Sequence, residues 1–337
     1  MSNSSTGAAA SLGLLSITYL TWIGQSVVIG CGNAILAGAI MKHKALRNRK
    51  EYLIILGLSM SDCFNMVAYG WAGCFRAYLL LNQTFSSCRS ALFCILQPSL
   101  ALWSFEHAGA LMLVIVSFDR FLSVTQPLRY LTLGRNYAYR LLAGAVCFGP
   151  GVWLFGVLLL LAGGHHTANL QAPCFTAKVY WAVHPYYAFL LMCSLPVLGL
   201  TSVLLYTAVG VAYVIKKRRA VEDENGAQSG ERRRQRRLTR NIGVSCLCTL
   251  TFLVIPIAVS YTGEFVGLSR LTMQILWLFP NFNPFCNLVI FVKRQPELRC
   301  AVIAMLRGKE MPPTLALWNL KTQTVKSLRR TDDVQAH

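Results

Sequence analysis

Carboxylates and an arginine lie within long apolar segments of the chain, at Asp62, at Glu106 and at the adjacent pair Asp119 and Arg120. A charged side chain in the middle of a bilayer costs ~2.5–3.5 kcal/mol on insertion scales, so such residues face a bundle interior and mark functional sites. Asp119 and Arg120 stand at the end of their segment, where an arginine can reach the membrane surface and pair with its neighbour. Residues of these types can form ion pairs, bind a cation or exchange a proton.

Enzymatic chemistry would require a converging catalytic pair or a set of metal ligands. Asp62 and Asp119 do not form such a pair, because they lie at different depths and Asp119 is at the membrane surface. We therefore predict that the protein is not an enzyme, with no catalytic residues and no metal cluster.

The elements that must position these residues are membrane-spanning helices. The 337 residues are 55% hydrophobic and 13% charged, and the apolar residues form blocks of roughly 20, the length that crosses ~30 Å of hydrocarbon. We predict an all-α, seven-transmembrane-helix bundle, with these spans: Ile17 to Met41, Tyr52 to Phe75, Ala91 to Val124, Tyr139 to Ala162, Pro185 to Ile215, Asn241 to Tyr261 and Leu268 to Val292.

The distribution of the 32 Lys and Arg residues sets the orientation, because positive loops stay on the cytoplasmic side. With the N-terminus outside, only Arg76, Arg89, Lys178 and Arg270 fall on the outer side. The sequons at Asn3 and Asn82 agree, since this topology places both where glycosylation occurs. The predicted location is the plasma membrane, with several passes.

The predicted organisation has four parts. Residues 1–16 form an extracellular N-terminus, 17–292 the bundle, 293–307 an amphipathic helix on the inner membrane surface, and 308–337 a flexible cytoplasmic tail. The amphipathic helix has basic residues on one side and apolar residues on the other, namely Leu298, Val302, Ile303 and Leu306. Within it, Cys300 is either a palmitoylation site or an unmodified thiol.

The formal charge of +19 does not indicate nucleic acid, because the basic residues lie directly beside membrane spans. Anionic lipid of the inner leaflet is the expected partner. The densest basic run, 232–237, falls between spans five and six and is open to two interpretations: a solvated helix extension touching lipid, or a direct contact with a partner protein.

Two cysteines differ from those inside the spans. Cys94 stands at the outer start of span three and Cys174 in the outer loop between spans four and five, an oxidising location that allows a disulfide. Cys88 is a competing partner for Cys174, and the sequence does not settle the connectivity.

Several short motifs now carry a resemblance to a known family. They occur in order on the spans: Gly32-Asn33, Leu58-Ser59-Met60-Ser61-Asp62, Asp119-Arg120-Phe121, Pro127-Leu128-Arg129-Tyr130, Pro196, Pro256 and Asn283-Pro284. Over about residues 17 to 307 the chain resembles the rhodopsin-like (class A) G-protein-coupled receptors.

The resemblance implies roles for particular residues. Asp62 with Asn33 and Asn283 would form a polar network that binds sodium and water; the alternative is a network that only joins helices. Arg120, beside Asp119, would enter the contact with a heterotrimeric G protein, and Leu128 would anchor it. Arrestin is a further partner that the family allows.

Departures from the family pattern are as informative as the matches. Arg236 stands where many members carry the acid that holds the span-three arginine, Val254 replaces the usual tryptophan before Pro256, and Asn287 replaces a tyrosine. This erosion is similar to that of the nematode serpentine chemosensory receptors.

The resemblance implies an extracellular ligand, and we expect either a small chemosensory compound or a peptide. Leu102 occupies the place of the aspartate of amine receptors, so an amine held by that salt bridge is not expected. Glu106 beside Trp103 could hold a cation or titrate on activation; alternatively it is a protonated acid bonded to a neighbouring backbone. Glu264 is a second candidate.

Pro196, Pro256 and Pro284 are predicted hinges, because proline in a membrane helix frees a backbone carbonyl and permits a kink. A membrane transporter or channel is the competing class, and it would be expected to show an internal structural repeat, which the sequence lacks. A receptor-like protein that does not couple to a G protein is the other alternative.

Overall fold

The computed structural model describes residues 3–164, 167–222, 244 and 247–310. The basic run 232–237, Arg236 and the tail beyond residue 310 lie outside these residues. The helices and strands are α1 Asn3–Lys42, α2 Lys44–Arg47, α3 Lys50–Leu81, β1 Cys88–Ser90, α4 Ala91–Ile95, α5 Pro98–Thr125, α6 Pro127–Thr132, α7 Arg135–Ala162, β2 Asn169–Gln171, α8 Thr176–Val183, α9 Pro185–Glu222, the π-helix η2 Leu250–Val254, α11 Ile255–Val266, α12 Arg270–Leu276, α13 Phe282–Arg294 and α14 Pro296–Leu306.

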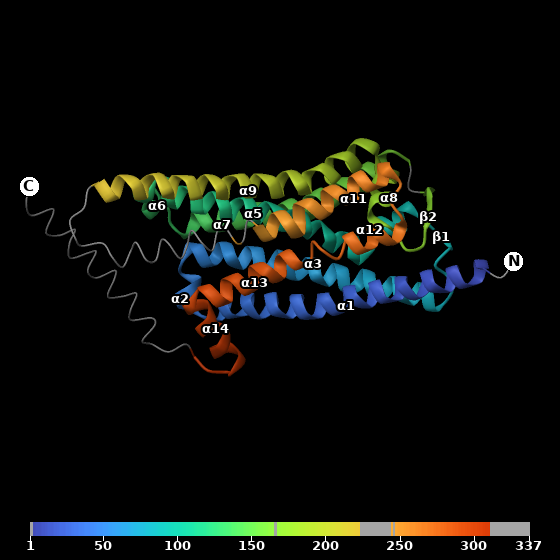
Figure 1. Cartoon of the computed structure of the whole chain (residues 1–337), viewed down its shortest axis with the longest axis horizontal. Coiled ribbons are helices and arrows are strands. Elements are labelled where there is room, and N and C mark those ends of the chain that lie inside the picture. The colour runs from blue at the N-terminus through green and yellow to red at the C-terminus, as the bar shows by residue number, and fades with distance from the viewer. Residues whose placement is uncertain (1–2, 165–166, 223–243, 245–246, 311–337) are drawn as a thin grey trace, which may run out of the picture.

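The described helices confirm the predicted all-α membrane bundle. Five are long and apolar enough to cross a bilayer: residues 13–42 of α1, then α3, α5, α7 and residues 185–215 of α9. They run side by side along the length of the molecule in Figure 1, and they correspond to predicted spans one to five. The first helix begins at Asn3, inside the expected extracellular segment, because the alanines and leucines of residues 8–15 favour helix.

Predicted spans six and seven differ in their continuity. Span six, where the structure describes it, is helical from Leu247, and the π-helix η2 leads directly into α11. Helix α11 ends at Val266 and is capped by Gly267, whose φ of +77° suits glycine. Span seven was predicted over Leu268 to Val292, and the described helices α12 and α13 lie within or near these bounds. It is interrupted between α12 and α13, where the buried Pro280 has no N–H to continue a helix.

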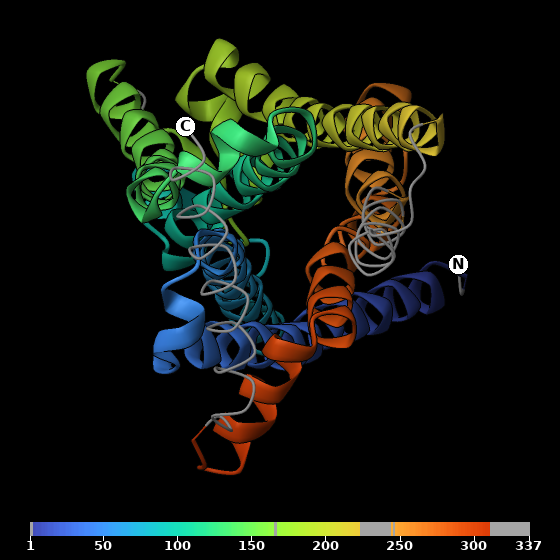
Figure 2. The same ribbon diagram turned by 90° about the vertical axis from the view of Figure 1, so that its left-hand side faces the viewer.

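Helix α5 packs against α3, α7 and α9, while α1 packs against α3 and α14. Gly149 of α7 permits the close approach to α5, because a Cβ there would lie 2.7 Å from the carbonyl oxygen of Ser104. Figure 2 shows the bundle from the end that carries α2, α6 and α14.

The two ends of the bundle differ. At the end near the N-terminus, β1 and β2 pair antiparallel with Cys88 opposite Gln171. At the opposite end α2, α6 and α14 lie across the helix termini (Figure 1). This second end carries the basic residues and is the cytoplasmic one.

Helix α14 begins at Pro296 and ends at Leu306, within the predicted amphipathic segment. The predicted apolar side divides into two. Leu298 is fully buried, whereas Ile303 and Leu306 are 41% and 65% exposed. The exposed pair is therefore free to contact lipid, while Leu298 fixes the helix to the bundle. Cys300 is a partly exposed free thiol.

Candidate functional site

The predicted pair Asp119–Arg120 lies near the cytoplasmic end of α5. Asp119 is fully buried, and Nη2 of Arg120 lies 3.4 Å from its Oδ2. The hydroxyl of Tyr130, in α6, donates to the same oxygen at 3.1 Å. Burial raises the pKa of the Tyr130 phenol, so this hydroxyl keeps its proton and remains a donor.

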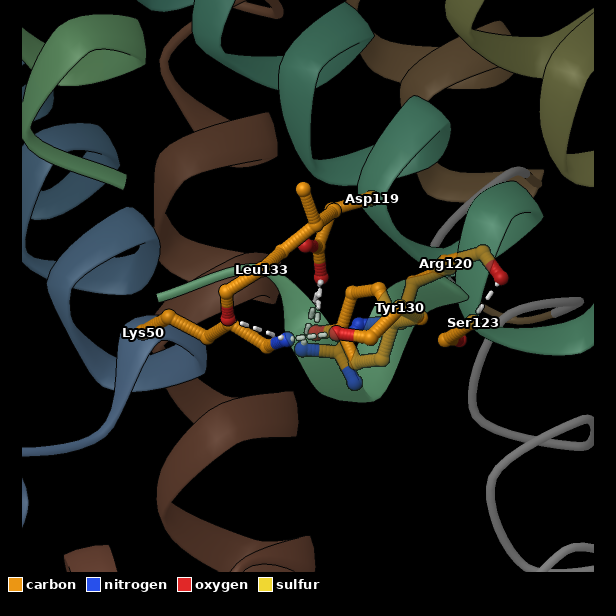
Figure 3. A network of polar contacts seen from close by, with 6 residues as sticks. All are labelled: Lys50, Asp119, Arg120, Ser123, Tyr130 and Leu133. Carbon is orange, nitrogen blue, oxygen red and sulfur yellow. Dashed lines mark hydrogen bonds and ion pairs between the residues drawn. The ribbon is translucent and has the colours of Figure 1, made fainter. Parts of the chain in front are cut away.

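Lys50, the first residue of α3, completes this network, and Figure 3 shows the arrangement. Its ammonium lies 3.5 Å from the centroid of the Tyr130 ring. It donates to the backbone carbonyl of Tyr130 and, at 3.0 Å, to that of Leu133. These carbonyls are at the C-terminus of α6, where a cation is favoured by the helix dipole.

The network holds α6 in place and fixes what it presents outward. Leu128 and Leu131 are 81% and 67% exposed at the cytoplasmic end. An exposed leucine pair on a short anchored helix can insert into an apolar pocket of a partner. The sequence predicted Leu128 for this role but missed Lys50, which counted only as one of the basic residues that set the topology.

A second cytoplasmic contact joins α14 to the start of α3. A carboxylate oxygen of Glu297 lies 2.7 Å from Nη1 of Arg49, and it accepts a hydrogen bond from the Tyr52 hydroxyl at 2.5 Å. This pairing could not be predicted from the sequence, since the partners are 248 and 245 residues apart.

In the middle of the bundle Asp62 is buried, and Gly109 of α5 leaves it space: a Cβ there would lie 3.6 Å from Oδ1 of Asp62. The expected direct bonds to Asn33 and Asn283 are absent from the described residues. Asn33 donates to the carbonyl of Ile29 in its own helix at 3.1 Å. Asn283 accepts from Thr249 at 3.1 Å, which links α13 to the residue before η2.

Towards the outer side, Trp103 and Glu106 are both buried on α5. The Trp103 indole donates to the Glu106 carboxylate, so Glu106 is bonded within its own helix and not to a neighbouring backbone. The Trp103 ring lies 4.9 Å from Tyr69 and 5.9 Å from Trp277. Glu264 belongs to α11, and its side chain lies outside the described residues.

The predicted hinges occupy three different settings. Pro196 is inside α9, Pro256 is the second residue of α11, which follows the π-helix directly, and Pro284 is in the first turn of α13. Single π-turns are frequent at functional sites. The break at Pro280 in span seven was not predicted from the sequence. A second proline, four residues before Pro284, was a signal that the helix is interrupted there.

At the outer end the structure joins Cys94 to Cys174 in a disulfide, with sulfur atoms 2.05 Å apart. The competing Cys88 is a free, exposed thiol in β1. The bridge ties the outer loop between α7 and α9 to α4. Asn82, which follows α3, is exposed; the Asn3 side chain lies outside the described residues.

The fold is that of a multi-pass membrane protein, with α6 anchored at the inner end, buried polar groups between the helices and a disulfide-bound outer loop. Residues 32–291 match the family described as 7 transmembrane receptor (rhodopsin family). The chain belongs to this family. No curated protein matches the sequence significantly.

Proposed function

We propose that this receptor lies in the plasma membrane, binds an extracellular ligand and activates a heterotrimeric G protein through its cytoplasmic end. The observation that carries the proposal is the network of Asp119, Arg120, Tyr130 and Lys50, which sets α6 at the inner mouth with Leu128 outward. A basic residue beside an exposed apolar anchor suits an interface with a protein partner.

Release of Arg120 from Asp119 is the proposed event at the inner mouth. The side chain of Arg120 is 19% exposed, and its one ion pair among the described residues is with its neighbour on the same helix. Asp119 is fully buried, so separating the two would leave its carboxylate inside the bundle with the Tyr130 hydroxyl as donor. Breaking a buried pair costs ~3–5 kcal/mol, and ligand and G protein together must supply this free energy before Arg120 can contact the G protein.

The ligand is proposed to be a small chemosensory molecule or a peptide, with Trp103, Glu106 and Glu264 near its site. Burial of Glu106 beside aromatic rings supports a role for it in binding. Membership of the nematode serpentine chemosensory group is proposed on the eroded motifs at Val254 and Asn287.

Asp62 is the proposed site of a sodium ion. Its carboxylate is buried and has no hydrogen-bond partner among the described residues, and the buried hydroxyl of Ser61 beside it also lacks one there. Oxygen atoms of this kind are the ligands that hard cations prefer. Lipid of the inner leaflet and arrestin are the remaining proposed partners.

The test is G-protein activation in cells, measured as nucleotide exchange without ligand after surface expression has been confirmed. We expect basal exchange in the wild-type chain, and its loss in Arg120→Ala. Arg140→Ala is the matched control, since Arg140 is an exposed basic residue of α7 at the same end. Equal exchange in the wild type and Arg120→Ala would contradict coupling through Arg120, and ion flux would then favour a channel.

A further inference from the structure

Arg76, near the outer end of α3, is a buried cation that is only 4% exposed. Its Nε donates to the carbonyl of Pro173 at 3.1 Å. The guanidinium carbon lies 5.0 Å from the ring centroid of Trp22 and 5.1 Å from that of Phe175. Among the described residues, no carboxylate lies within 4.0 Å of this guanidinium.

The setting of Arg76 is fixed from two sides. Gly73, one turn earlier on α3, allows α1 to approach closely, because a Cβ there would lie 3.0 Å from the carbonyl oxygen of Tyr19. That approach places Trp22 against the guanidinium. On the outer side, Pro173 and Phe175 flank a cysteine of the disulfide, so the loop that covers Arg76 is held covalently.

The groups around Arg76 offer more donors than acceptors. A guanidinium carries five N–H donors, and Pro173 accepts from Nε alone. The indole N–H of Trp22 is also buried and has no partner in the described part of the chain. A buried charge without an opposite charge, and buried donors without acceptors, are costly, so these groups favour a ligand that supplies both.

We propose that Arg76 binds the carboxylate of a small extracellular ligand whose apolar body packs against the neighbouring aromatic rings. The inference deepens the proposed receptor function, on which it rests, by naming the chemical class of the ligand. A carboxylate accepts two parallel N–H bonds from a guanidinium fork. It would supply both the missing negative charge and the missing acceptors.

The rings that continue from Arg76 account for the apolar body. Trp22 lies 5.5 Å from Tyr69, and Tyr69 lies 4.9 Å from Trp103. This row of rings continues from the cation towards Glu106, so it offers contacts to the aromatic or aliphatic body of an acid of moderate length. A bare inorganic anion would pair with the charge but leave the rings unused.

The test measures the thermal unfolding of the purified full chain in phosphatidylcholine nanodiscs. The probes are indole-3-acetate and decanoate, each compared with its uncharged primary amide. We expect both acids to raise the Tm of the wild type and the amides to have little effect. In Arg76→Gln the affinity for the acids should fall by roughly ten- to a hundredfold, the loss of charged hydrogen bonds.

Matched variants separate binding from structure. Arg89→Gln removes an exposed outer arginine that also lies over a ring, that of Phe93, and should keep the full response. Trp22→Phe keeps the ring but removes the N–H, and should weaken the response. Because Arg76→Gln keeps a donor for Pro173 and removes an unpaired charge, the Tm without probe should not fall.

Three results would overturn the proposal. These are no shift with either acid, an equal shift with the amides or with sodium chloride, and an Arg76→Gln variant that unfolds earlier yet retains the acid response. The last result would show that Arg76 stabilises the outer loop and does not bind the acid. The measurement does not involve a G protein, so its failure is distinct from a failure of coupling.

Discussion

Replacing Lys50 by methionine removes the ammonium group that anchors α6 while keeping a long unbranched side chain. Three interactions disappear: the contact with the Tyr130 ring and the hydrogen bonds to the carbonyls of Tyr130 and Leu133. A cation over a ring contributes ~0.5–2 kcal/mol, and bonds to charged groups ~1.5–3 kcal/mol when buried. Lys50 is half-buried, so we take about 2 kcal/mol for the whole set.

This free energy has a direct readout in the hydrogen exchange of α6. The amides of Tyr130 and Leu133 are bonded to the carbonyls of Gln126 and Tyr130, and they exchange when α6 opens. Since about 1.4 kcal/mol is a factor of ten, a loss of about 2 kcal/mol should speed this exchange roughly 30-fold. G-protein activation should fall as well, because Leu128 would no longer be held in position.

Lys44→Met is the control for the loss of one positive charge. Lys44 lies in α2 at the same end of the bundle, and its side chain is exposed. Its replacement should leave exchange in α6 unchanged. If amide exchange in α6 is equally fast in the two variants, the anchoring role of Lys50 is refuted. Lys50 would then contribute only its positive charge to the inner membrane surface.

Three further outcomes are expected. Cys94→Ser should lower the free energy of unfolding by ~2–5 kcal/mol and reduce surface expression. Cys174→Ser should have the same effect, because both variants break the same bond. A clear difference in Tm between the two variants would contradict a bond that joins only these cysteines. Glu297→Gln removes the ion pair with Arg49 and should lower the free energy of unfolding by at most ~1 kcal/mol. It should also speed amide hydrogen exchange in α14. Unchanged exchange in α14 would show that buried apolar contacts alone hold this helix. Sodium should raise the Tm of the wild type but not of Asp62→Asn, and an equal rise with potassium would argue against a sodium site.

Several features could be predicted from the sequence because they depend on local composition. The spans follow from apolar runs long enough to cross hydrocarbon, and their orientation follows from the basic loops. The Asp119–Arg120 pair was recognisable because both residues are adjacent in the chain and end an apolar segment. These signals need no knowledge of which helices are neighbours.

Tertiary structure decided which distant groups meet. Lys50 contacts Tyr130 across 80 residues and Arg49 contacts Glu297 across 248, and no periodicity in either segment encodes the pairing. Asp62 is buried as predicted, but among the described residues Asn33 bonds to Ile29 and Asn283 to Thr249 instead of to Asp62. Whether Cys94 or Cys88 bonds to Cys174 could also be decided only from the fold.

The sequence by itself therefore determined the membrane bundle, its orientation and the inner charged pair. Hydrophobicity and charge act on each segment independently, so a single chain reveals them. Only the tertiary structure decided the break of span seven, the anchor of α6 and the burial of Arg76 with no carboxylate beside it among the described residues. Each depends on the backbone path and on the groups that other helices bring within a few ångströms, where hydrogen bonds and charge pairing operate.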